Sequence, residues 1–143
     1  MRVRASAVAA TSIPTAPERD RYARDASPRA HGATDVGRVR RQNQDAFGFS
    51  PDGRLLVVAD GMGGHAAGEV ASALALESLE AALEEGHALD AAFAMANAQV
   101  HERAREPDKK GMGTTLTAVL ADDGEYFVAN VGDSRGYLLT GDG

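Results

Sequence analysis

The stretch from Leu55 to Glu69 constrains the fold more than any other part of this sequence. It reads LLVVADGMGGHAAGE. Four apolar residues predict a buried strand over 55–58, and the glycines after Asp60 predict a tight loop. Asp60 is therefore expected at a strand end, where a rigid element aims its carboxylate, and the glycines allow the backbone to approach a ligand closely. Such a loop binds either a cation through Asp60 or an anion through its amides.

A dinucleotide-binding fingerprint is a competing interpretation of the same loop, because Gly61-x-Gly63-x-x-Ala66 follows a strand and opens a helix. Two features argue against it. Asp60 would place a carboxylate against the pyrophosphate. The acidic residue expected about 20 positions further on would be Glu80 or a neighbour, which lies inside a predicted helix.

Length and charge limit the remaining classes. A chain of 143 residues is sufficient for one domain. The net charge of -6 argues against a nucleic-acid partner, and the absence of cysteine excludes disulfides and zinc–thiolate sites. No apolar run approaches the ~18 residues that cross a bilayer. We expect a cytoplasmic protein that binds neither nucleic acid nor membrane.

The first 30 residues are expected to form a disordered leader, because they carry three prolines and no periodicity. The leader is either a solvated tail or a docking arm. From His31 onward the pattern predicts alternating order. The expected strands are 46–49, 55–58, 115–120, 126–131 and 135–140. The expected helices are 68–85 and one from Leu89 that ends before Pro107, packed as an antiparallel pair.

Three polar loops interrupt the predicted strands, at 40–45, 60–64 and 132–135. Asp60 and Asp133 each stand beside a glycine, and carboxylates with freed backbone carbonyls are oxygen ligands for Mg²⁺ or Mn²⁺. An arginine nearby would add a clamp for phosphate. His65 remains open between a general acid, a ligand and a loop-packing residue.

Four motifs together resemble the first half of a bacterial metal-dependent serine/threonine protein phosphatase of type 2C, from about residue 32 to the end. They are Thr34-Asp35-Val36-Gly37-x-Val39-Arg40-x-x-Asn43-Gln44-Asp45, Val58-Ala59-Asp60-Gly61-Met62-Gly63-Gly64-His65, Gly113-Thr114-Thr115 and Val131-Gly132-Asp133-Ser134-Arg135. The resemblance implies an α+β fold, namely a partial four-layer α-β-β-α sandwich with antiparallel sheets flanked by helix pairs. Residues 31–143 would be the amino-terminal part of the catalytic domain, truncated before its carboxy-terminal strands.

The resemblance also implies a site and an activity. Asp60 would bridge two metals, Gly61 would contribute its carbonyl, and Asp133 would serve a third, so two or three Mn²⁺ or Mg²⁺ ions are implied and no organic cofactor. Asp45 would support metal-bound water, and Arg40 would hold the substrate phosphate. The implied activity is dephosphorylation of phosphoserine or phosphothreonine proteins by metal-activated water, with a serine/threonine kinase as a further partner.

Three departures from the family pattern qualify this implication. Gln44 stands where many members have glutamate, and Met62 stands where animal members have a histidine. The later Asp-Gly and Asp-Asn motifs, which supply two more metal carboxylates, are absent. We therefore expect a fragment that is inactive alone. The alternative is a non-catalytic phosphoprotein-binding or regulatory remnant.

Overall fold

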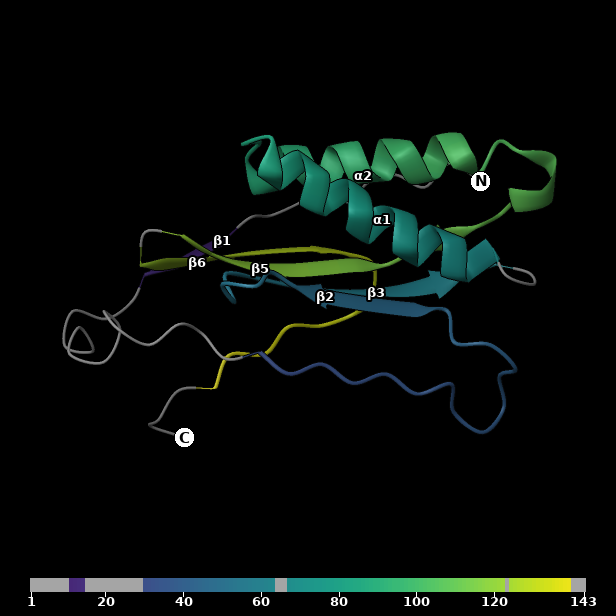
Figure 1. Cartoon of the computed structure of the whole chain (residues 1–143), viewed down its shortest axis with the longest axis horizontal. Coiled ribbons are helices and arrows are strands. Elements are labelled where there is room, and N and C mark those ends of the chain that lie inside the picture. Colours follow the sequence, from purple (N-terminus) through teal and green to yellow (C-terminus); the bar gives the residue numbers. More distant parts are fainter. Residues whose placement is uncertain (1–10, 15–29, 64–66, 123, 140–143) are drawn as a thin grey trace.

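The computed structural model describes residues 11–14, 30–63, 67–122 and 124–139, which form an antiparallel sheet with two helices on one face (Figure 1). The elements are β1 (Thr11–Pro14), β2 (Asp45–Phe49), β3 (Leu55–Met62), α1 (Ala67–Glu84), α2 (Leu89–Arg103), a 3-10 turn (Pro107–Lys109), β4 (Gly113–Thr114), β5 (Leu116–Asp122) and β6 (Glu125–Val131).

The strands follow the order β1-β6-β5-β3-β2, and β4 pairs with the far end of β3. Every pairing is antiparallel. β5 and β6 form the expected hairpin, in which Asp122 pairs with Glu125 across a two-residue connection. Gly124 has a φ of 79°, the left-handed conformation that such a short turn favours. The predicted hairpin is confirmed.

β3 lies near the middle of the sheet and alternates strictly between two environments. Leu55, Val57 and Ala59 are buried, and the residues between them are exposed. The strand is longer than its apolar run predicted, because β4 pairs with Gly61 and Met62. Asp60 therefore lies inside the strand, two residues before its end, and not at the strand end as expected.

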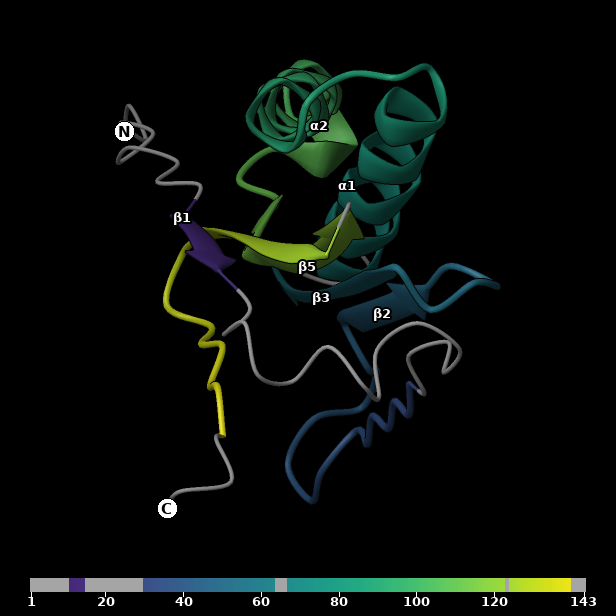
Figure 2. The same ribbon diagram turned by 90° about the vertical axis from the view of Figure 1, so that its left-hand side faces the viewer.

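The two helices share one face of the sheet and pack against each other (Figure 2). α1 buries Ala71, Ala75, Leu79 and Ala82, a stripe at helical spacing with small side chains that allow close approach. α2 contributes the other half of this core with Leu89, Ala92, Phe93, Ala96 and Val100. Within the described residues, no helix combines the length and apolar character needed to span a bilayer.

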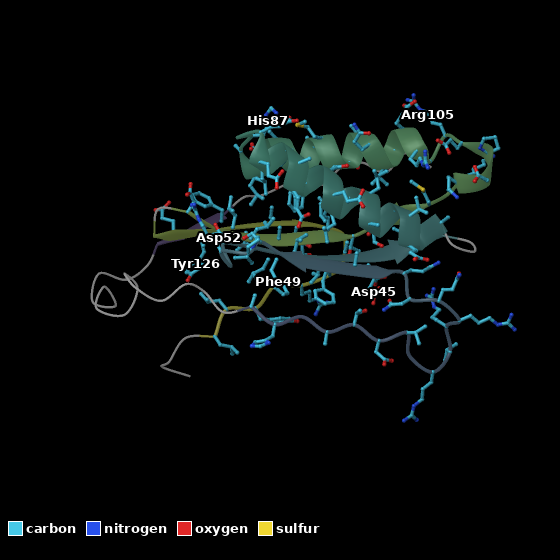
Figure 3. All side chains as sticks on the ribbon, viewed as in Figure 1. Asp45, Phe49, Asp52, His87, Arg105 and Tyr126 are labelled. Carbon is cyan, nitrogen blue, oxygen red and sulfur yellow. The ribbon has the colours of Figure 1, made fainter. Side chains whose placement is uncertain are left out.

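The opposite side of the sheet carries no helix and exposes large apolar side chains. We call this side the open face and define it by Phe47, Phe49, Leu56, Val58 and Tyr126, which are between 37% and 47% exposed. Figure 3 shows Phe49 and Tyr126 on the side away from the helices. The segment 30–44 runs along this side, where Gly32 contacts the Phe47 ring. The described chain thus has one sheet and one helix layer, as a partial sandwich requires.

Two segments differ from the sequence expectation. Thr11–Pro14, inside the expected disordered leader, forms β1 and pairs with Glu125–Val128 of β6. The expected strand over 135–140 is wrong for its described part, since residues 134–139 form no strand. The reason is that β6 is already paired with β5 on one side and β1 on the other, which leaves no hairpin partner for the chain that follows. Residues 1–10 and 15–29 of the expected leader lie outside the described residues.

Candidate metal centre at the Asp60 end of the sheet

Asp45 and Asp60 stand directly opposite each other on neighbouring strands. Their Cα atoms are register partners in the β2–β3 pairing, so both side chains belong to the same face of the sheet. Both residues are exposed, on the side away from the helices. Figure 3 shows Asp45 on this side, at the end of the sheet far from Asp52. The strand pairing therefore brings together two loops that are separated in the sequence.

The charges around Asp60 identify the rest of the site. Partial desolvation raises the pKa of Asp60, the carboxylates of Asp45 and Asp133 raise it further, and the Arg40 guanidinium lowers it. Asp133 belongs to the loop after β6, which returns to the same end of the sheet as Asp60. Three carboxylates and one arginine thus act on a common point. The three carboxylates repel one another, and a bound cation would relieve this repulsion.

The backbone at Gly61 is crowded from two sides, and this explains why a glycine stands there. A Cβ at Gly61 would collide with the backbone oxygens of Gly68 and Gln44. Gly68 is constrained likewise, since its Cβ would come within 2.7 Å of the Gln44 side chain. The first turn of α1 therefore lies against the end of β3, and the two glycines permit this close approach.

One carbonyl joins β2, β3 and α1 beside the two carboxylates. The Gln44 carbonyl accepts hydrogen bonds from the Gly61 amide at 3.0 Å and from the Ser72 hydroxyl at 2.7 Å. Ser72 is 1% exposed. A buried polar group of this kind is stabilising only when it is hydrogen-bonded, so the helix holds Gln44 and its neighbour Asp45 in place.

The Gln44 side chain lies between Arg40 and the glycine loop. Its Oε1 is 3.5 Å from Arg40 Nη1, and its Nε2 is 3.4 Å from the Gly63 carbonyl oxygen. A glutamate could accept from Arg40 but could not donate to Gly63. The neutral side chain at this departure from the family pattern therefore connects the arginine to the loop.

The loop before β2 is held by side-chain hydrogen bonds. Asn43 Nδ2 donates to Thr34 Oγ1 at 2.7 Å, and the Asp45 amide donates to Asn43 Oδ1 at 3.1 Å. Thr34 Oγ1 is in turn 3.5 Å from Asp45 Oδ2. These contacts orient the Asp45 carboxylate from the side opposite to β3.

The donor set suits a hard divalent cation but is partial. Asp60, Asp45, Asp133 and the Gly61 carbonyl offer only oxygen, which Mg²⁺ and Mn²⁺ prefer. The described residues, however, contain no group of three or more aspartate, glutamate, histidine or cysteine side chains placed to hold one ion. The chemistry of the donors fits, and the number of them within ligand distance does not reach a full coordination shell.

The structure brings together all five residues singled out from the sequence, which are Arg40, Asp45, Asp60, Gly61 and Asp133. His65, which the sequence left open as a general acid or ligand, lies outside the described residues. Sequence reasoning missed Ser72 and Thr115, whose hydroxyls hold the backbone of the site. The available signals were a serine within the apolar stripe of α1 and the second threonine of the Gly113-Thr114-Thr115 motif.

Comparison with known proteins gives a consistent result. Residues 37–143 match the family described as "Protein phosphatase 2C". The serine/threonine protein phosphatase PstP of Mycobacterium tuberculosis is 46% identical over an alignment of 114 residues, which covers 74% of this chain and 22% of that protein. The serine/threonine phosphatase stp of Listeria welshimeri is 42% identical over an alignment of 120 residues, which covers 74% of this chain and 48% of that protein.

Solved structures of the same kind share the fold. The crystal structure of PstP/Ppp from Mycobacterium tuberculosis superimposes with a TM-score of 0.67 at 45% identity, covering 75% of this chain and 48% of that one. A PstP catalytic domain in complex with two manganese ions gives a TM-score of 0.66 at 44% identity, covering 75% and 49%. The chain thus spans about half or less of the relatives it matches.

Proposed function

This chain belongs to the protein phosphatase 2C family, and on that premise we propose that it contributes the amino-terminal half of a metal-dependent site that dephosphorylates phosphoserine and phosphothreonine in proteins. The observation that carries the proposal is the pairing of Asp45 with Asp60, with Asp133 and Arg40 close enough to shift the pKa of Asp60. A phosphoprotein is the substrate class and a serine/threonine kinase its natural source.

Each residue has a distinct part in the proposed site. Asp60, Asp133 and the Gly61 carbonyl would hold Mn²⁺ or Mg²⁺, which supplies Lewis-acid activation when bound. Arg40 binds the phosphate oxygens through its guanidinium, as a forked donor suits a tetrahedral anion. Asp45 accepts a hydrogen bond from the attacking water and orients it. The sheet fixes Asp45 and Asp60, while the arginine lies on the exposed loop before β2.

The chain alone is proposed to bind metal weakly and to have no turnover. A hard cation takes about six oxygens, and no group of three acidic side chains placed for one ion occurs among the described residues. The binding is tested by titrating residues 1–143 with Mn²⁺ in a calorimeter, and the turnover by assay on a phosphopeptide. Micromolar binding with metal-dependent turnover by the monomer would show that this half is sufficient. The alternative of a non-catalytic remnant has no structural observation in its favour.

The site itself is tested in a chimera in which residues 31–143 replace the matching segment of the Listeria relative. Its activity should require Mn²⁺ and disappear in excess chelator. Arg40→Ala should mainly raise KM, because Arg40 binds the phosphate, whereas Asp60→Asn should mainly lower kcat. Arg41→Ala is the matched control for Arg40 and should leave KM unchanged. Full activity in chelator, or an unchanged KM for Arg40→Ala, would contradict the assignment.

A further inference from the structure

Thr115 holds the backbone of Asp60 from both sides. Its Oγ1 accepts a hydrogen bond from the Asp60 amide at 2.9 Å, and its own amide donates to the Asp60 carbonyl at 2.9 Å. The residue is 5% exposed, directly before β5. The amide of Asp60 is thus satisfied by a side chain, whereas the residues before it on β3 pair with a strand. The hydrogen bond of the Asp60 amide consequently depends on this one hydroxyl.

The same side chain contacts both neighbours of Asp133. Thr115 Oγ1 is 2.8 Å from Ser134 Oγ. A Cβ added at Gly132 would lie 2.6 Å from Thr115 Cγ2, so the Gly132 backbone rests on the threonine methyl group. A hydroxyl has one proton and two lone pairs, so Thr115 can accept from Asp60 and still hydrogen-bond to Ser134.

The strand order explains why a side chain is needed to connect the Asp60 backbone to the Asp133 loop. Asp60 lies on β3 and Asp133 follows β6, and β5 lies between these two strands. The two carboxylates therefore belong to segments that the strand ladder does not pair directly. A group that fixes one relative to the other has to bridge from the β5 position, and Thr115 stands at that position.

We propose that Thr115 is a positioning residue that sets the Asp60 carboxylate relative to the Asp133 carboxylate through its hydroxyl. The effect of Thr115 on metal binding rests on the proposed function. Its effect on the backbone of Asp60 and of the Asp133 loop rests on the hydrogen bonds and contacts alone. If Thr115 only accepted a hydrogen bond from the Asp60 amide, its removal would alter the backbone at Asp60 and leave the Asp133 loop unchanged.

The experiment uses the 143-residue chain and four single variants. Thr115→Val removes the hydroxyl and keeps the shape, and Thr115→Ser keeps the hydroxyl. Ser134→Ala removes the partner beside Asp133. Thr117→Val is the matched control, because Thr117 is equally buried and donates to Asn130 Oδ1 at 2.5 Å on β6. Amide hydrogen exchange by NMR reports the backbone, and calorimetric Mn²⁺ titration reports the site.

Thr115→Val should speed exchange of the Asp60 amide by about tenfold or more, since it leaves that N–H without its acceptor. It should also raise exchange over 132–134 and weaken Mn²⁺ binding. Thr115→Ser should restore exchange and Mn²⁺ binding to within about twofold of the wild-type chain. Thr117→Val should leave the Asp60 amide and Mn²⁺ binding unchanged. Ser134→Ala should raise exchange only over 132–134, leave the Asp60 amide protected, and still weaken Mn²⁺ binding.

An unchanged Asp60 amide in Thr115→Val, or an equal effect of Thr117→Val, overturns the proposal. Failure of Thr115→Ser to rescue overturns it as well. If Thr115→Val does not fold, Ser134→Ala decides, and unaltered exchange over 132–134 overturns the link. If Mn²⁺ binding by the wild-type chain is too weak for calorimetry, the exchange measurements alone decide the role of Thr115, and the metal of the proposed function is tested separately in the chimera.

Discussion

The helix-covered face and the open face of the sheet are built from the same strands but have different roles. On the covered face, β3 places Leu55, Val57 and Ala59 in a core with α1 and α2. On the open face, the alternate residues of β3 include Leu56, Val58 and the carboxylate of Asp60. A single alternating strand thus supplies stability on one side and the candidate chemistry on the other.

This separation has a physical reason. Burying apolar side chains away from water stabilises the fold. The alanine-rich helices pack close to the sheet and exclude water from that face. Carboxylates that are to meet a metal and a phosphate must keep access to solvent. The open face provides that access but exposes apolar side chains as well, between 37% and 47% of each. Four experiments test this difference between the two faces.

The largest effect is expected from the same substitution made on each face. Leu79→Ala removes a side chain that is 0% exposed in α1 and should lower the free energy of unfolding by about 3 kcal/mol. Leu56→Ala, at 38% exposed on β3, should cost under about 1.5 kcal/mol. Urea unfolding of both variants measures the difference. Equal losses would mean that something covers the open face in solution.

The second experiment concerns the crowding at the end of β3. Gly61→Ala places a methyl group against the backbone oxygens of Gly68 and Gln44 and should destabilise the chain by about 1–3 kcal/mol or more. Gly113→Ala is the control at the same end, because its methyl group would meet only the flexible Met62 side chain, at 3.4 Å. Thermal unfolding of the two variants should differ clearly. Similar melting temperatures would contradict the tight junction between α1 and β3.

The third experiment tests the exposed apolar surface. Contiguous apolar surface of this kind promotes association, so the chain should sediment faster as its concentration rises. Phe49→Lys should reduce that dependence while changing stability by only about 0.5 kcal/mol. Val39→Lys is the control, since Val39 is 92% exposed but lies in the loop before β2. If both variants sediment alike, the open face is not the surface that associates.

The fourth experiment, with the smallest expected change in stability, compares two carboxyl groups whose pKa is raised. Partial desolvation is the main cause for both Asp60 and Glu80. In each case the folded chain binds the proton more tightly than the unfolded chain. The contribution of each group to stability is therefore greatest below its ordinary pKa, 3.8 for Asp60 and 4.5 for Glu80, and is lost as pH rises through the raised folded pKa.

Neutral variants should remove this pH-dependent loss. Without metal, Asp60→Asn and Glu80→Gln should each raise stability at neutral pH by up to about 0.5 kcal/mol. With Mn²⁺ the stabilities of the two variants should differ, because the ion should still stabilise Glu80→Gln and should no longer stabilise Asp60→Asn. Melting temperatures with and without Mn²⁺ provide the check. Equal stabilisation of both variants by the ion would remove Asp60 from the metal site.

Much of the fold followed from local patterns. The spacing of Ala71, Ala75 and Leu79 marks one face of a helix, and Gly86, at a φ of 85°, ends α1 where expected. The Asp-Gly turn before Glu125 predicted the hairpin. The five candidate site residues each stand in a motif that the family resemblance assigns. The structure places Asp60 and Gly61 on β3 and Asp133 after β6, and their roles stay predictions.

Other features could not be found in this way because they depend on partners distant in the sequence. β1 is a strand because β6 offers it an edge, and its own residues carry no periodicity. Residues 134–139 form no strand although their pattern allows one, because that edge is taken. Ser72 and Thr115 matter through single hydroxyls whose acceptor or donor lies 28 or 55 positions away.

Local sequence patterns were sufficient for the two helices, the central strand and the β5–β6 hairpin, because helix periodicity, strand alternation and turn residues act between near neighbours. Tertiary structure alone decided which carboxylates face each other and which buried hydroxyls hold them. Asp45 and Asp60 meet through strand register, and Asp60 is tied toward the Asp133 loop through Thr115. Register and side-chain hydrogen bonds arise only when the whole sheet has assembled, since they require groups from β2, β3, α1, the residue before β5 and the loop after β6 to converge.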